Sequence, residues 1–254
     1  MSSATFRFYE ELNDFLPDTS RKRPIPFPFE VSPSVKDAIE ALGVPHVEVD
    51  LIVVNGRSVG FGHRLCDGDR IAVYPIFESI DISPIVRLRP EPLRETMFIA
   101  DVHLRRLARL LRLLGFDAVH SNEYEDAQIV AIARDESRII LTRDRQLLKH
   151  GAVTHGYWVR NTNPIEQARE TVRRFDLSDQ TRPFSRCLSC NGLLVRVEKD
   201  DVLERIPPKT AAWLDEYYEC ESCRKLYWQG THAGSLRRIV DRISGSPFRG
   251  EAPQ

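Results

Sequence analysis

The chain has 254 residues, enough for one or two domains of ordinary size, or more if the modules are small. Its 42% apolar and 29% charged residues are typical of a soluble globular protein, and no apolar run approaches the 18 residues of a membrane span. The first residues, MSSATFRFYEEL, lack a basic segment followed by an apolar one, so no export signal is predicted and we expect a cytoplasmic protein.

The net charge of −1 says little by itself, so we count the charge of each segment. Residues 1–90 carry a net charge of −3, whereas 91–184 and 185–254 carry +1 each. Because no segment is a strongly basic block, any contact with nucleic acid must come from the local placement of arginines.

Residues 1–80 show the pattern of a small domain with a sheet. Phe6 and Phe8 alternate with polar residues in a first strand, and IPFPFEV alternates in a second. Pro26 and Pro28 lack N–H groups on the same side of that second strand, which predicts a sheet edge. Ser34 and Asp37 predict a capping box, and Gly43 ends the helix that follows it.

The rest of this segment predicts a hairpin and a last strand. Asn55-Gly56 is a typical hairpin turn inside DLIVVNGRSV, and CDGDRIAVYP is a turn followed by a strand. The order β-β-α-β-β, with VVNGR and DGDRIAVYP, resembles a β-grasp or ubiquitin-like domain, similar to the small sulfur-carrier subunits of molybdopterin and thiamine synthesis. Those carriers end in a free Gly-Gly tail, whereas this strand runs on into IFESIDISPIVRLRPEPL. We therefore expect a binding or packing module here.

Strands and helices alternate in residues 97–182, after a proline-containing linker at 81–96. The expected strands are MFIAD, FDAVHS, RIILT and VTHGYWVR; the expected helices are 102–114, 126–134, 144–150 and 164–175. This alternation predicts an α/β domain with a parallel sheet.

Three acids stand where strands end or helices begin. Asp101 ends a strand, Asp126 begins a helix, and Asp144 follows the end of another strand. Ligands bind at the carboxyl ends of the strands of an open parallel sheet, and carboxylates that converge there need a cation. Mg²⁺ or Mn²⁺ suits such oxygen ligands and can activate water against a phosphodiester. The alternative for Asp126 and Asp144 is a helix N-cap, a role that does not exclude metal binding.

Longer segments resemble a known family. FIADVHLRRLARLLRLLGFDAV, DAQIVAIARDESRIILTRDRQLL, RCLSCNGLL and YWQGTH are similar to the Mut-seven C-terminal RNase family, a PIN-like nuclease domain fused to a zinc ribbon. An N-terminal ubiquitin-like domain is a recognised arrangement in that family. The resemblance implies a metal-dependent ribonuclease, with Asp101, Asp126 and Asp144 as the matching catalytic acids. A fourth acid, which PIN nucleases often use, has no obvious match among Glu123, Glu125 and Asp117.

Arginines near these acids are candidates for binding phosphate. Arg143 and Arg145 flank Asp144, and their planar guanidinium groups suit phosphate oxygens. Arg105 and Arg109 belong to the polar side of the first helix of this domain, together with Arg106 and Arg112. These four arginines could form a strip that contacts RNA phosphates. The alternative is that they only form the solvated face of the helix.

Four of the five cysteines form two pairs in residues 183–245. Cys187-x2-Cys190 and Cys220-x2-Cys223 predict a structural zinc site with four thiolate ligands. Lys225, Tyr227 and Trp228 are candidates for contacts with RNA, and core packing of the ribbon is the alternative. We expect an amphipathic helix to close this region, a disordered tail at 246–254, and a buried Cys66.

Three functions are consistent with these patterns. The first is a ribonuclease that uses Mg²⁺ or Mn²⁺ and acts on single-stranded or structured RNA, such as tRNA. The second is a non-catalytic RNA-binding or adaptor protein that uses the zinc ribbon and the β-grasp domain. In the third, the β-grasp domain docks a protein of sulfur or cofactor metabolism.

Overall fold

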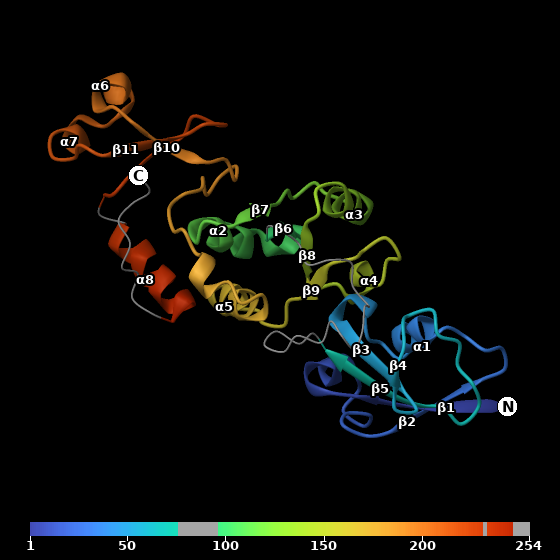
Figure 1. Ribbon diagram of the computed structural model, residues 1–254. Coiled ribbons are helices and arrows are strands. Elements are labelled where there is room, and N and C mark those ends of the chain that lie inside the picture. The colour runs from blue at the N-terminus through green and yellow to red at the C-terminus, as the bar shows by residue number, and fades with distance from the viewer. Residues whose placement is uncertain (76–95, 231–232, 246–254) are drawn as a thin grey trace. The chain divides into compact units, whose positions relative to one another are not determined.

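The computed structural model describes residues 1–75, 96–230 and 233–245 (Figure 1). The chain forms two compact units: Met1–Arg94 with Asp144–Trp158, and Glu95–Arg143 with Val159–Gln254. Most of the expected linker at 81–96 and the whole tail at 246–254 lie outside the described residues. No helix in the described part of the chain is long and apolar enough to span a membrane.

The N-terminal domain is a five-stranded mixed sheet in the order β2-β1-β5-β3-β4, with helix α1 packed on it (Figure 1). Its central strands β1 and β5 pair in parallel, and the other neighbours are antiparallel. The elements are β1 (Ser2–Phe8), η1 (Glu10–Phe15), β2 (Ile25–Phe29), α1 (Val35–Ala41), η2 (His46–Glu48), β3 (Val49–Val54), β4 (Arg57–Ser58) and β5 (Arg70–Pro75). Their apolar faces form one core that contains Phe6, Ile39 and Ile52.

Local sequence signals explain most of this domain. The strand with Pro26 and Pro28 is the edge strand, since nothing pairs with β2 on its outer side within the described sheet. Ser34 and Asp37 form the expected capping box. Asn55 and Gly56 both have positive φ, 49° and 82°, as a type I′ turn requires. The expectation for Cys66 was wrong: it is exposed, and its backbone N–H donates to Asp69 at the tight turn before β5.

The segment formed by residues 144–158 packs with the N-terminal domain. It contains α4 (Arg145–Leu148) and β9 (Gly156–Trp158). Lys149 Nζ donates to Glu40 O at 2.7 Å, and Trp158 N donates to the Glu48 carboxylate at 2.7 Å. Buried His46 donates from Nε2 to Val153 O at 3.0 Å. These contacts place Asp144–Trp158 in the first compact unit.

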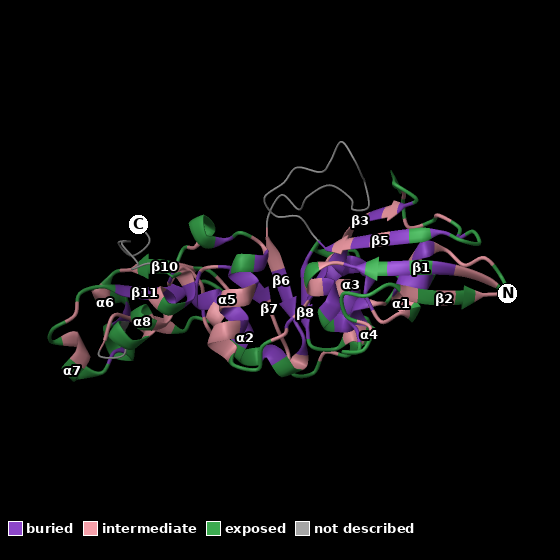
Figure 2. Cartoon of the chain, turned by 90° about the horizontal axis from the view of Figure 1, so that it is seen from below, coloured by how far each residue is buried: buried purple, intermediate pink, exposed green. Residues whose placement is uncertain are grey.

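The α/β domain contains a sheet of order β7-β6-β8-β9, and the pairs β6–β7 and β6–β8 are parallel. Its strands β6 and β8 are almost entirely buried (Figure 2). The elements are β6 (Met97–Ala100), η3 (Val102–Leu104), α2 (Arg105–Leu113), β7 (Asp117–Val119), α3 (Asp126–Asp135), β8 (Ile139–Thr142), α5 (Pro164–Arg174) and η4 (Ser178–Gln180). The expected helix at 102–114 begins instead as a 3-10 turn.

Strand order determines where the chain can form a site. Helix α2 leads from β6 to β7 on one side, and α3 then leads from β7 across β6 to β8. Right-handed crossovers in opposite directions place these helices on opposite faces of the sheet. After β8 the chain adds β9 on the side away from β6. The connection that leaves β6 and the one that leaves β8 therefore run in opposite directions from the carboxyl ends of these two strands. Such a switch point is where open α/β sheets bind their ligands.

The last region contains an antiparallel sheet of order β10-β11-β12 and a C-terminal helix. Its elements are β10 (Leu194–Val197), α6 (Lys199–Val202), η5 (Leu203–Arg205), α7 (Pro208–Ala211), β11 (Tyr217–Cys220), β12 (Leu226–Trp228) and α8 (Ala233–Ser244). The amphipathic closing helix was expected, whereas the short helices between the cysteine pairs were not. A small core around Val202, Ile206 and Tyr217 covers one side of this sheet.

Candidate functional site

Asp101 lies at the switch point and is the most constrained of the predicted acids. It follows β6 directly, and only 7% of its surface is exposed. Its backbone N–H donates to Leu141 O in β8 at 2.9 Å. The carboxylate does not cap the following 3-10 turn; instead Oδ2 accepts a hydrogen bond of 2.7 Å from the Thr142 hydroxyl.

Thr142 connects Asp101 to the end of the neighbouring strand. Thr142 is fully buried at the last position of β8, so its hydroxyl fixes the orientation of the Asp101 carboxylate. The other carboxylate oxygen, Oδ1, accepts no hydrogen bond from any residue that the structure describes. A mostly buried carboxylate can act as a ligand of a cation when one oxygen is fixed by a hydrogen bond and the other can coordinate the ion.

Asp126 begins α3, as expected, but it does not cap this helix, so the alternative reading as an N-cap was wrong. Glu125 is the N-cap, and its backbone N–H donates to Gln128 Oε1 at 2.9 Å in a capping box. Asp126 is exposed. Because α3 follows β7, its first turn lies toward the edge of the sheet at which β7 ends. With its capping role removed, Asp126 keeps a carboxylate that is available for other contacts.

Asp144 caps α4, as its alternative reading allowed. Its Oδ1 accepts a hydrogen bond of 2.7 Å from Gln146 N, and the residue is exposed. Asp144 belongs to a different compact unit from Asp101 and Asp126. Among the described residues, only the four paired cysteines bring three or more metal-ligating atoms within 4.8 Å of one another. A metal site formed by the three aspartates therefore stays a prediction.

Asp117, one candidate for a fourth acid, has a structural role. Its carboxylate is bound by Arg138 at 2.5 Å, Arg186 at 3.2 Å and Asn191 at 2.8 Å. Burial alone would raise the pKa of Asp117, but the hydrogen bonds from Arg138 and Asn191 and the charges of both arginines lower it overall. Glu125 is the cap of α3, and Glu123 is exposed.

The four candidate phosphate-binding arginines differ in their surroundings. Arg145 lies 4.1 Å from the Trp158 ring centroid and donates to Phe15 O at 3.1 Å, so its guanidinium group is engaged in packing within the first unit. Arg143 is exposed and donates to Asn161 O at 2.8 Å. The side chains of Arg105 and Arg109 are exposed on α2 and have no ion pair or hydrogen bond with any described residue.

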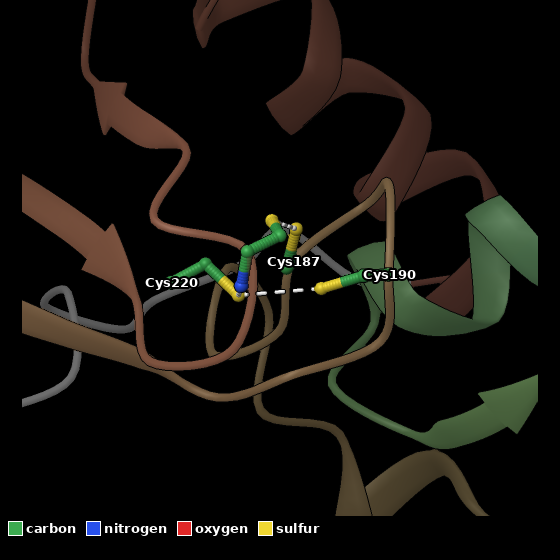
Figure 3. A group of neighbouring side chains, drawn as sticks. Cys187, Cys190 and Cys220 are labelled. Carbon is green, nitrogen blue, oxygen red and sulfur yellow. Dashed lines mark hydrogen bonds between the residues drawn. The ribbon is translucent and has the colours of Figure 1, made fainter.

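The four paired cysteines lie close enough together that they could hold a tetrahedral metal ion. Cys190 and Cys220 have sulfur atoms 3.3 Å apart, and Cys187 and Cys223 have theirs 3.6 Å apart (Figure 3). A Zn–S distance of about 2.3 Å in a tetrahedron implies sulfur separations of about 3.8 Å, close to these values. The separations are far longer than a disulfide bond of about 2.05 Å.

Charge also favours a cation at this site. Burial and the neighbouring thiols raise the pKa of Cys190 to about 12, so four thiolates cannot share this space unless a cation neutralises them. Tyr227 donates its hydroxyl toward Cys187 Sγ at 3.0 Å, and Trp228 packs against the ribbon core. The contacts of Tyr227 and Trp228 therefore favour a packing role within the ribbon over stacking on RNA bases.

Backbone geometry brings the two cysteine loops close together. A Cβ at Gly192 would lie 2.9 Å from Cys220 Sγ and 2.6 Å from Ser222 Oγ, so only glycine fits there. In the second loop, Arg224 takes the positive φ of 60° at which a glycine is common. The close approach of the second loop therefore explains the glycine at position 192.

Polar contacts attach the metal-binding region to the edge strand of the α/β sheet. Buried Arg112 donates from Nε to Ala118 O at 2.8 Å and from Nη1 to Leu188 O and Ser189 O at 3.3 and 3.0 Å. Asn191 accepts from Ala118 N at 3.0 Å. The first cysteine loop is therefore hydrogen-bonded to both α2 and β7.

Comparison with known proteins agrees with this arrangement. Residues 96–240 match the Mut7-C RNAse domain, and residues 1–81 match the Mut7-C ubiquitin domain. No curated protein and no solved structure matches the chain. The RNase-domain match covers more than half of the 254 residues and includes the parallel sheet and all four paired cysteines. The chain therefore belongs to the Mut7-C RNase family and carries the family's ubiquitin-like domain in front of the RNase domain.

Proposed function

We propose that this protein is a ribonuclease that hydrolyses RNA phosphodiester bonds with Mg²⁺ or Mn²⁺ bound by Asp101, Asp126 and Asp144. The RNase-domain match indicates a nuclease, and the observation that carries the metal site is the position of Asp101. It is buried at the switch point, oriented by Thr142, and has one carboxylate oxygen without a partner among the described residues.

Chain connectivity supports the inclusion of the other two acids. Thr142 donates to Asp101, and Asp144 is two residues farther along, so its Cα lies within about 7 Å of the Thr142 Cα. Asp126 begins the helix that follows β7, whose carboxyl end lies at the same sheet edge as those of β6 and β8. A shift of the Asp144 side chain from its cap bond to a cation would give up about 1 kcal/mol of helix capping, which binding of the cation would have to offset.

The chain's own groups have defined tasks in this proposal. A divalent ion bound there would polarise a phosphoryl oxygen and lower the pKa of a bound water. Thr142 would keep the Asp101 carboxylate in one orientation, as hydrogen-bonded partners of metal ligands do. Arg143, exposed just after β8, would stabilise the negative charge of the phosphate.

The test is cleavage of a labelled RNA pool with and without added Mn²⁺. Asp101→Asn should lower the rate at least about 100-fold, because the carboxylate charge is lost while the shape is kept. Asp135→Asn is the matched control, since Asp135 is an exposed acid at the far end of α3 and should cleave like the unmodified chain. Equal cleavage by all three proteins would mean a contaminating nuclease and would overturn the proposal.

A non-catalytic RNA-binding protein is the second candidate, favoured by the cap bond of Asp144 and by the ribbon. It predicts RNA binding without Mn²⁺-dependent cleavage in any preparation. In that case Asp144→Asn would lower only the melting temperature, as loss of a helix cap does.

A further inference from the structure

A pocket of about 400 Å³ lies between α2, the loop after β7 and the two cysteine loops. It is lined by Arg105, Arg109, Arg112, His120, Ser121, Asn122, Leu188, Ser189 and Lys225. Its volume falls within the range of pockets that hold small ligands. The pocket is lined by four cationic side chains and by no carboxylate.

Helix geometry explains why three arginines reach one pocket. Arg105, Arg109 and Arg112 are spaced by four and three residues along α2, so they lie on one face of that helix. Arg106, although adjacent in sequence and also exposed, does not line the pocket. The polar side of α2 is therefore divided, with one face turned to the pocket and Arg106 outside it.

Two of the four cations of this pocket lack a counter-ion among the described residues. Arg105 and Arg109 form no ion pair within the described part of the chain. Arg112 is 5% exposed, and its bonds to three carbonyl oxygens involve Nε and Nη1. None of these three bonds uses its Nη2. Like charges gathered this closely repel one another, which favours an anionic ligand.

The metal-binding region supplies the opposite wall. Lys225, two residues after Cys223, donates to the Ser189 hydroxyl at 3.0 Å, and Ser189 lies inside the first cysteine loop. Both cysteine loops therefore contribute to the pocket, and Arg112 ties the first loop to α2. A bound metal ion would hold this wall in place against the arginines of the α/β domain.

We propose that this pocket binds a phosphate group of an RNA strand, clamped between α2 and the zinc ribbon. The naming of RNA as the source of the phosphate rests on the proposed ribonuclease function. Arginine and lysine together suit phosphate oxygens, and the hydroxyl and amide groups of Ser121 and Asn122 add neutral donors. The pocket thus gives the ribbon a direct part in holding the substrate.

The test is the affinity of the full-length, zinc-loaded protein for a 3′-labelled single-stranded RNA, measured by fluorescence anisotropy without added Mn²⁺. Arg109→Ala and Lys225→Ala should each raise Kd about five- to tenfold and lower the salt slope by about one. Arg106→Ala is the matched control and should stay within about twofold, because it is outside the pocket. Unchanged melting temperatures are expected, since these residues are exposed.

Two forms of the RNA distinguish the source of the phosphate. If the pocket holds a terminal phosphate, the effect of Arg109→Ala will vanish with RNA that has a 5′-hydroxyl end; if it holds an internal phosphodiester, both RNAs will show the effect. The proposal would be overturned if Arg106→Ala and Arg109→Ala raised Kd for RNA equally, or if neither changed it. Binding that depends on Arg109 and Lys225 in a protein that cleaves no RNA would keep the pocket and refute only the nuclease.

Discussion

At the scale of single residues, the acids of the α/β domain fall into distinct environments. Among the described residues, buried Asp101 has a single side-chain hydrogen bond, from Thr142, whereas Asp117 is surrounded by Arg138, Arg186 and Asn191. A carboxylate that is saturated by cationic partners contributes to stability and has little capacity left for a metal ion. We therefore expect Asp101 to bind a metal ion and Asp117 to stabilise the fold.

Replacement of Asp117 tests its structural role. Asp117→Ala should lower the free energy of unfolding by about 2 kcal/mol, because buried Arg138 would lose one of its two carboxylate partners and keep only Glu136. Asp135→Ala, which removes an exposed ion pair with Arg134, should change it by less than about 0.5 kcal/mol. Urea denaturation at pH 7 measures both, and equal effects would contradict the assigned role.

The pH dependence of the Asp117 contribution has a definite sign. Its folded-state pKa is lowered from the ordinary 3.8, so the unfolded chain takes up this proton first as the pH falls. The stabilisation is fully present above about pH 4 and is lost progressively below it. The difference in stability between the native protein and Asp117→Ala should therefore shrink in urea titrations at lower pH.

At the scale of elements, the first cysteine loop and β7 are connected. Asn191 accepts from Ala118 N, and Arg112 connects Ala118 O with the carbonyl groups of the loop. A change in the metal site should therefore alter the stability of β7, although β7 contains none of the cysteine ligands. The ribbon is in this respect part of the structure that supports the α/β sheet.

Hydrogen exchange with and without zinc measures that connection. Removal of zinc should accelerate exchange of the Ala118 amide, because the loop that carries its acceptor loses order. Amides in the pairing of β3 with β5 serve as the internal control and should not change. Equal protection of Ala118 in both states would show that the loop keeps its place without the ion.

Sequence reasoning succeeded where one short segment determines the outcome. The Ser34–Asp37 box, the Asn55-Gly56 turn, the prolines of β2 and the cysteine spacing are all local signals, and the structure contains each. Prediction from the sequence failed where a residue's role depends on a partner that is distant in the sequence. The packing of Arg145 on Phe15 and Trp158, and the joint contribution of α2 and Lys225 to one pocket, depend on contacts across long sequence separations. The alternative reading of Asp126 as the cap of α3 missed the true cap, Glu125, by one residue, because glutamate is an uncommon cap.

At the scale of the whole molecule, family boundaries and packing boundaries differ. The RNase-domain match spans 96–240 without interruption, yet Asp144–Trp158 packs with the N-terminal domain. Phe15, Glu40 and Glu48 of that domain hold the segment through Arg145, Lys149 and Trp158. The ubiquitin-like domain therefore supports the segment that begins with Asp144, and experiments on the acids require the full chain.

Binding of Mn²⁺ to the full-length, zinc-loaded protein, measured by electron paramagnetic resonance, tests the central claim most directly. The unmodified chain and Asp135→Asn should each bind Mn²⁺, and Asp101→Asn should lose most of that affinity, because a neutral amide replaces the buried carboxylate. Equal Mn²⁺ binding by all three proteins, or none by the unmodified chain, would contradict a metal site at Asp101.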